Sequence, residues 1–155
     1  SLDIYGPGEI KEYLKEDVRG VQYQGTYQPG SAQQVMSQYD MLIVPSRHDG
    51  WGLVVNEALL QNVPAIVSDR VGAKILVEYS GAGRVFKSEN VGHIKKVLLS
   101  IVDNPEELNL MRENCEKVHE FISPDYGSFY LKKIIDFYFY DEGGQPKVIW
   151  KNQAL

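Results

Sequence analysis

The sequence predicts an α/β protein built on a doubly wound, parallel sheet. Short apolar runs, bounded by glycine, proline or polar turn residues, alternate along the chain with segments of helical spacing. This alternation is typical of parallel sheets with helices on both faces. A chain of 155 residues with 43% hydrophobic residues is long enough for a single core. We expect one domain over residues 1–140 and a tail over 141–155 that is loosely ordered or foreign to the fold.

Five strands, each followed by a helix, are expected before residue 104. The apolar runs place strands near residues 2–5, 20–24, 41–45, 64–68 and 84–86. Helices are expected near residues 8–16, 30–39, 52–61, 71–79 and 90–103. The last of these is supported by apolar side chains at helical spacing, namely Ile94, Val97, Leu98 and Ile101.

The rest of the chain predicts two further helices. Asn104 as N-cap and Pro105 at the first helical position start a helix that runs to about residue 121. The segment 123–125 breaks it, and a final helix covers residues 129–140. The aromatic run at 137–140 puts rings on every side of that helix, so some are expected at the surface unless another body packs over them.

Composition excludes several classes of function. The net charge of −5 and the pI near 5.2 argue against a nucleic-acid-binding surface, which needs clustered basic residues. No run of 18 apolar residues exists, so no membrane span is predicted. The single cysteine, Cys115, excludes an internal disulfide, and its place in a charged helical segment predicts a structural thiol.

The stretch 41–64 carries the clearest chemical signal. Its apolar strand opens through Gly50 and Gly52 into the next helix, which leaves backbone N–H groups at the helix start for an anion. Asp49 lies in the turn. Glu57 lies about one turn into the helix, where its carboxylate can accept hydrogen bonds from two neighbouring hydroxyls, as on a ribose. Because open α/β sheets bind ligands outside the carboxyl ends of their strands, this pattern predicts a site for a phosphorylated sugar.

The full string over residues 45–64 resembles the signature of the retaining glycosyltransferases called group 1, or family 4, which have the GT-B fold. It reads Pro-Ser, a carboxylate, Gly-aromatic-Gly-Leu, Glu-Ala, and then the proline that opens the next apolar strand. Neighbouring segments resemble that family in the expected order, at residues 2–8, 21–25, 68–78 and 80–86. The resemblance covers residues 4 to about 140 and implies one Rossmann-like half of a two-domain GT-B enzyme.

The resemblance implies the C-terminal, donor-binding domain of a hexosyltransferase-type enzyme. Such an enzyme moves a sugar from a nucleotide-diphosphate-sugar donor to an acceptor hydroxyl with retention, and it uses no metal and no other cofactor. The acceptor, a glycan, lipid or small molecule, would be held mainly by an N-terminal domain. We expect that domain, and the first strand and helix of this one, to lie upstream of Ser1.

The chain is therefore expected to be a fragment that binds donor weakly and completes no transfer alone. A role in polysaccharide biosynthesis and a cytoplasmic location follow from the same resemblance. So does peripheral contact with the inner face of the membrane, made through the missing domain. The final helix is expected to cross back to that domain.

Residue roles are carried over only where the motif matches. Glu57 matches the carboxylate that holds the nucleotide ribose. Asp49, the expected catalytic residue, stands where the family usually has Glu, so its shorter side chain contacts the donor sugar differently or through water. Donor binding is expected from the remaining motif residues: Ser46, His48, Gly50, Trp51, Gly52 and Leu53.

Structural interpretations stand beside these roles. Trp51 follows a buried strand and is expected to fill the core rather than to stack on substrate, and Ser46 suits a turn-stabilising role. Cations at the crevice rim could stabilise a leaving diphosphate, although solvated surface charge is the default for them. These rim residues are Arg47, His48, Arg70 and Lys74.

Three further positions qualify the site. His48 and Asp49 are adjacent on a loop and make no chelating face, so no metal site is predicted. Asn62 replaces a frequent glycine between helix and strand, and Asn tolerates the left-handed conformation that this turn requires. Ala73 replaces the second glycine of a frequent Gly-Gly pair at the donor-facing loop, which narrows the room for a phosphate or sugar.

Two other classes of function stay open. One is a nucleotide-sugar epimerase on the same fold, which the string over residues 45–64 disfavours. The other is a non-catalytic module that binds nucleotide-sugar, in which Asp49 in place of Glu marks lost activity.

Overall fold

The computed structural model describes residues 1–7, 18–28 and 30–148. Five strands are present there, each within one residue of its expected place at either end. They are β1 (Leu2–Tyr5), β2 (Val21–Gly25), β3 (Leu42–Val44), β4 (Ala65–Ser68) and β5 (Gly83–Phe86). The helix expected near residues 8–16 lies outside the described residues.

The described part of the chain has six helices. They are α1 (Ala32–Met36), α2 (Leu53–Leu59), α3 (Lys74–Ser80), α4 (Val91–Val102), α5 (Pro105–His119) and α6 (Pro124–Phe139). The expected start of α5 is confirmed, since Pro105 opens it and Asn104 Oδ1 accepts a hydrogen bond from the Glu107 amide over 3.3 Å.

Helix α1 is shorter than the expected 30–39, and α3 and α6 start elsewhere than expected for local reasons. Helix α3 begins only at Lys74, because Val71 instead forms a parallel β-bridge with Asp49. Helix α6 begins earlier than expected, because Ser123 caps it and Pro124 stands at its first position, whereas α5 has already ended at His119. There Ser123 Oγ accepts a hydrogen bond from the Tyr126 amide over 3.1 Å.

All strand pairs are parallel, as expected, but the strands form two sheets rather than one. Strand β1 pairs with β2, with Leu2 opposite Val21. Strand β4 pairs with β3 on one side and β5 on the other, with Ile66 opposite Ile43. Strands β1 and β3 do not pair with each other.

Helices cover both faces of the three-stranded sheet, which confirms the doubly wound arrangement. Every residue of β4 is buried, and side chains alternate between the two faces. Ala65 and Val67 pack in a cluster with residues of α2, α3 and α5. Ile66 packs on the opposite face with residues of β5, α4 and α5. Such continuous burial is typical of a central parallel strand.

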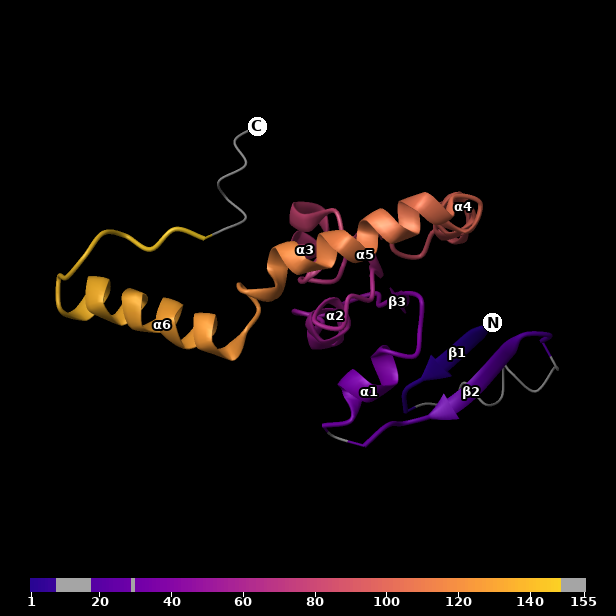
Figure 1. The fold of residues 1–155 in the computed structure, drawn as a ribbon, viewed down its shortest axis with the longest axis horizontal. Coiled ribbons are helices and arrows are strands. Elements are labelled where there is room, and N and C mark those ends of the chain that lie inside the picture. Colours follow the sequence, from indigo (N-terminus) through magenta and orange to yellow (C-terminus); the bar gives the residue numbers. More distant parts are fainter. Residues whose placement is uncertain (8–17, 29, 149–155) are drawn as a thin grey trace.

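Helix α6 stands apart, because none of its residues is buried. Figure 1 shows it projecting away from the strands, with the chain after it turning back above it. The exposed aromatic end is confirmed: Tyr138, Phe139 and Tyr140 all lie at the surface. Its first turn is anchored, since the ring of Tyr126 packs edge-on against Phe121 with centroids 5.2 Å apart.

Candidate functional site

The motif loop is held by its backbone against the turn that follows β4. The Asp49 amide donates to the Arg70 carbonyl over 3.1 Å, and the Gly72 amide donates to the Asp49 carbonyl over 3.1 Å. Both bonds lie beyond the carboxyl ends of β3 and β4, the edge at which open α/β sheets bind ligands. The position of Asp49 is therefore fixed by the main chain on both sides.

Two glycines allow this close approach. A Cβ atom at Gly72 would lie 2.2 Å from the carbonyl oxygen of Gly50 and 3.0 Å from Cα of Trp51. Gly52, which precedes α2, has a φ of 87°, and a Cβ there would lie 2.6 Å from Val71 Cγ1. The loop therefore needs glycine at position 72 because a larger residue has no space there. It needs glycine at position 52 because of both the limited space and the positive φ.

The carboxylate of Asp49 turns back onto its own loop. Its Oδ1 accepts a hydrogen bond from the Trp51 amide over 3.1 Å, and the side chain is half-buried. This arrangement resembles an Asx turn, in which Asp bonds to the main chain two residues ahead. An ionised carboxylate has about four acceptor positions, so one such bond leaves capacity for hydroxyl groups of a ligand.

Glu57 lies on α2 beside a tyrosine that the sequence did not single out. The side chain of Glu57 is half-buried. Burial raises the pKa of Tyr27, and the negative charge of Glu57 raises it further, so the two groups lie within electrostatic reach. The ring of Tyr27 packs edge-on against Tyr5 with centroids 5.9 Å apart. The charge of Glu57 therefore acts on a ring that packs against a second aromatic side chain.

Trp51 is not in the core, contrary to expectation. Its side chain is 39% exposed, and its indole Nε1 donates to Asn56 Oδ1 on α2 over 3.0 Å. The Ala73 amide fixes the Trp51 main chain by donating to its carbonyl over 2.6 Å. The loop turns outward between its two glycines, so the ring lies on the surface instead of against the sheet. Leu53 is also exposed.

Ser46 and Lys74, two other predicted residues, each take part in a hydrogen bond to a main-chain carbonyl. The carbonyl of Ser46 accepts a hydrogen bond from Ser68 Oγ over 2.5 Å, which ties β3 to β4 at their carboxyl ends. Lys74 Nζ donates to the Asp69 carbonyl over 2.7 Å. The Ser46 contact is made by its main chain, so the turn-stabilising role expected of a serine side chain stays a prediction. Lys74 is bound to the backbone of the β4–α3 connection that precedes it.

A cavity of about 290 Å³ lies beyond the ends of β3, β4 and β5. It brings together three of the four predicted rim residues, Arg47, His48 and Arg70, whereas Glu57 and the segment 50–53 do not line it. The other lining residues, which sequence reasoning missed, are Asp69, Lys87, Ser88 and Glu89. The available signal was their position directly after β4 and β5.

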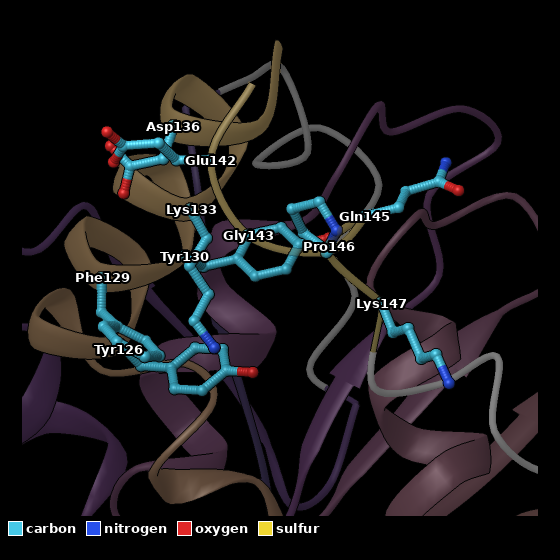
Figure 2. A pocket seen from close by; sticks show the side chains of 11 residues that line it. Tyr126, Phe129, Tyr130, Lys133, Asp136, Glu142, Gly143, Gln145, Pro146 and Lys147 are labelled. Atoms are coloured by element: carbon cyan, nitrogen blue, oxygen red, sulfur yellow. The ribbon is translucent and has the colours of Figure 1, made fainter. Parts of the chain in front are cut away.

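A second hollow, of about 630 Å³, lies between α6 and the chain that follows it. Figure 2 shows its lining, with Tyr126, Phe129, Tyr130 and Lys133 coming from the helix. The ammonium of Lys133 lies 4.4 Å from the centre of the Phe129 ring. None of the predicted site residues lines this hollow.

Among the described residues, no group of three or more His, Cys, Asp or Glu side chains could hold a metal ion. In the same part of the chain, no helix is both long and apolar enough to span a bilayer.

The motif loop lies within the part of the chain that matches a known protein family. A model of the family described as "Glycosyl transferases group 1" matches residues 3–118, which include the motif loop, Glu57 and all five strands. None of the curated proteins matches this chain.

Solved structures resemble the chain over most of its length. Sucrose-phosphate synthase from Thermosynechococcus elongatus has 20% identity and a TM-score of 0.65, covering 86% of this chain and 38% of that one. WaaG, a glycosyltransferase involved in lipopolysaccharide biosynthesis, has 19% identity and a TM-score of 0.71, covering 92% and 38%. HepE from Anabaena, in complex with UDP, has 16% identity and a TM-score of 0.67, covering 84% and 40%.

These likenesses confirm the expected fold, a Rossmann-like half of a GT-B glycosyltransferase. The chain spans about two fifths of the length of the three proteins that it resembles.

Proposed function

The chain belongs to the group 1 glycosyl transferases, and on this premise we propose that it binds the nucleotide-sugar donor of a glycosyl transfer reaction. One observation carries the proposal. The loop with Asp49 is fixed at the carboxyl edge of the sheet by backbone bonds, and Glu57 lies on the helix that this loop opens. Because the chain covers about two fifths of its structural relatives, transfer itself is proposed for a protein that also contains an acceptor-binding domain.

The two sides of the site take different parts of the donor. Glu57 accepts hydrogen bonds from the ribose hydroxyls, and Tyr27 beside it lines the nucleoside end. Asp49 contacts the transferred sugar with the acceptor positions that its loop bond leaves free. The amides of Gly50, Gly52 and Leu53 face the sugar and diphosphate, whereas the Trp51 amide is bonded to Asp49.

The reaction proposed for the whole protein is hexosyl transfer with retention and without a metal ion. The bond between the anomeric carbon and the phosphate oxygen breaks, and a bond to the acceptor oxygen forms on the same face of the sugar. The proton of the acceptor hydroxyl passes to the departing phosphate oxygen. Negative charge develops on the leaving diphosphate, and fixed N–H groups at the loop stabilise it. The complex of HepE with UDP supports UDP as the first nucleotide to test.

The donor site is tested by calorimetric titration with UDP, and in parallel with GDP and ADP. Replacing Glu57 with Gln removes a charged acceptor, and hydrogen bonds to charged groups contribute about 1.5–3 kcal/mol. We expect Glu57→Gln to raise Kd about tenfold or more for the nucleotide that binds. Glu78→Gln is the matched control, because Glu78 is an exposed glutamate on the neighbouring helix α3.

Two results would contradict the donor site. One is the absence of binding of all three nucleotides to the unaltered chain. The other is a Kd for Glu57→Gln within twofold of that for Glu78→Gln. Binding without any transfer by the longer protein would instead favour a non-catalytic module, in which Asp49 in place of Glu is the altered residue.

A further inference from the structure

Three consecutive strands bring positive charge to one cavity beside the candidate donor site. Arg47 follows β3, Arg70 follows β4 and Lys87 follows β5, and all three line the cavity of about 290 Å³. His48 adds a fourth nitrogen-bearing side chain. Such convergence at the carboxyl edge of a parallel sheet is an arrangement suited to an anionic ligand.

The acidic residue between these cations is occupied in holding the loop after β5. Asp69 Oδ1 accepts a hydrogen bond from the Ser88 amide over 2.9 Å. That bond chiefly lowers the pKa of Asp69, and the charges of Arg70, Lys74 and Lys87 lower it further. Asp69 is thus an ionised support for the loop, and the cations that act on it are close enough to act on a ligand in the same cavity.

The second acidic residue makes a contact that a ligand can replace. Glu89 pairs with Arg47, Nε to Oε1, at 3.2 Å, and the two side chains are 66% and 83% exposed respectively. Exposed ion pairs contribute little to stability. An anion bound in the cavity can therefore take over the guanidinium of Arg47 while Glu89 turns to solvent.

The cavity also has a hydroxyl group with unused bonding capacity. Ser88 Oγ is buried, and in the described part of the chain it has no hydrogen-bond partner. Buried polar atoms are satisfied in most proteins, so such a group calls for an explanation. A ligand oxygen in the cavity that Ser88 lines would provide the missing acceptor.

The cavity adjoins the turn that holds the motif loop. The main chain of Asp49 bonds to Arg70 and Gly72, and its carboxylate accepts from the Trp51 amide. Arg70 lines the cavity, whereas Asp49, the segment 50–53 and Glu57 do not. A group bound there lies close to the motif loop without contacting these residues of the proposed donor site.

We propose that this cavity binds a phosphate group carried by the acceptor substrate, separately from the diphosphate of the donor. The inference rests on the proposed function, because it assigns the cavity to the second substrate of that reaction. Phosphate fits the donor set, since it offers three terminal oxygens and the cations come from three different strand ends. Arginine is suited to bidentate contact with such a group.

The test is a titration of the 155-residue chain with inorganic phosphate at low ionic strength, monitored by amide NMR. It is carried out with and without saturating nucleoside diphosphate. We expect saturable shifts at Arg70, Ser88 and Glu89 and a phosphate Kd that the nucleotide changes by less than twofold. Arg70→Gln and Lys87→Gln should each raise that Kd at least threefold. Lys96→Gln, on an exposed lysine of α4, is the matched control and should leave it unchanged.

Acetate serves as the planar anion for comparison, and we expect it to bind at least threefold more weakly than phosphate. Competition between phosphate and the nucleotide would overturn the inference, because the cavity would then belong to the donor diphosphate. Unchanged phosphate binding in Arg70→Gln, or equal binding of acetate, would overturn it as well. If the unaltered chain binds no nucleotide, the proposed function and the acceptor role are overturned together. If it binds nucleotide but no phosphate, only this inference is overturned.

Discussion

Gly72 is the residue on which the form of the motif loop depends most directly. Its position leaves no room for a methyl group, because a Cβ atom would meet the Gly50 carbonyl oxygen at 2.2 Å. The obstacle is backbone, which cannot rotate away as a side chain can. The Gly72 amide also donates to Asp49, so any displacement of this segment moves the candidate site.

We predict that Gly72→Ala lowers the free energy of unfolding by about 3 kcal/mol, the upper range for overpacking in a tight site. Gly50→Ala is the matched control, because Gly50 lies in the loop on the other side of the same contact. A Cβ at Gly50 meets nothing within 4 Å, so its effect should stay within about 0.5 kcal/mol. Urea denaturation of both variants measures the difference. Equal effects of the two substitutions would show that the loop relaxes and that the close approach is not required.

Single residues were predictable where their own backbone chemistry decides the outcome. Asn62 has a φ of 57°, as expected for a residue chosen for a left-handed turn. Trp51 was not predictable, because its burial depends on which way the loop turns after β3. That direction is set by bonds from Gly72 and Ala73, which are distant in sequence. Tyr27 was missed for the same reason, since only the folded chain brings it near Glu57.

At the scale of elements, α5 places Cys115 in the core against α2, α3 and the three-stranded sheet. Its side chain is fully buried, and Sγ donates to the Met111 carbonyl at 3.4 Å. Burial raises the pKa of the Cys115 thiol to about 11 from an ordinary value of 9.0. The expectation of a structural thiol is confirmed by this burial.

We predict that the native chain resists thiol reagents at pH 8 and reacts at least a hundredfold faster once unfolded in guanidinium. Stability should fall between pH 9 and pH 11, because in that window the unfolded thiol releases its proton and the folded thiol keeps it. Labelling with a chromogenic disulfide reagent measures the first effect, and urea midpoints measure the second. Cys115→Ala is the control and should lose this part of the pH dependence. Rapid stoichiometric labelling of the native chain would contradict the prediction.

Elements were predictable where local signals suffice, and their ends were not where tertiary contacts decide. The capping residues placed the start of α5 correctly. The start of α3 was wrong because the residues before Lys74 are held in the bridge to the motif loop. For α6, the serine-proline segment starts the helix, whereas the sequence reading used it only as a break.

At the scale of the molecule, strand positions followed from sequence while strand pairing did not. Each strand is recognisable from its own residues. The alternation of strands and helices along the chain does not specify which strands lie side by side in a sheet. The structure leaves β1 and β3 in separate sheets. Contact between the parts is made by side chains instead, since Tyr39, in the α1–β3 connection, donates its hydroxyl to Asp3 Oδ2 over 2.7 Å.

Helix α6 contributes little to the stability of the rest of the molecule. It has no buried residue, and the contact of its first turn with Phe121 is made by Tyr126. The described residues after Tyr130 therefore lie beyond that contact. Removing them exposes little apolar surface that was covered before, and stability follows the apolar area removed from water.

We predict that a chain ending at Tyr130 unfolds within about 2 °C of the full chain, because a change of 1 kcal/mol shifts Tm by only a few degrees in a domain of this size. Phe121→Ala in the full chain is the comparison. It removes the ring between Tyr79 and Tyr126 and should lower Tm by more than the truncation. Thermal unfolding followed by circular dichroism measures both. A larger fall in Tm for the truncated chain than for Phe121→Ala would mean that α6 packs against the domain in solution, and it would refute its independence.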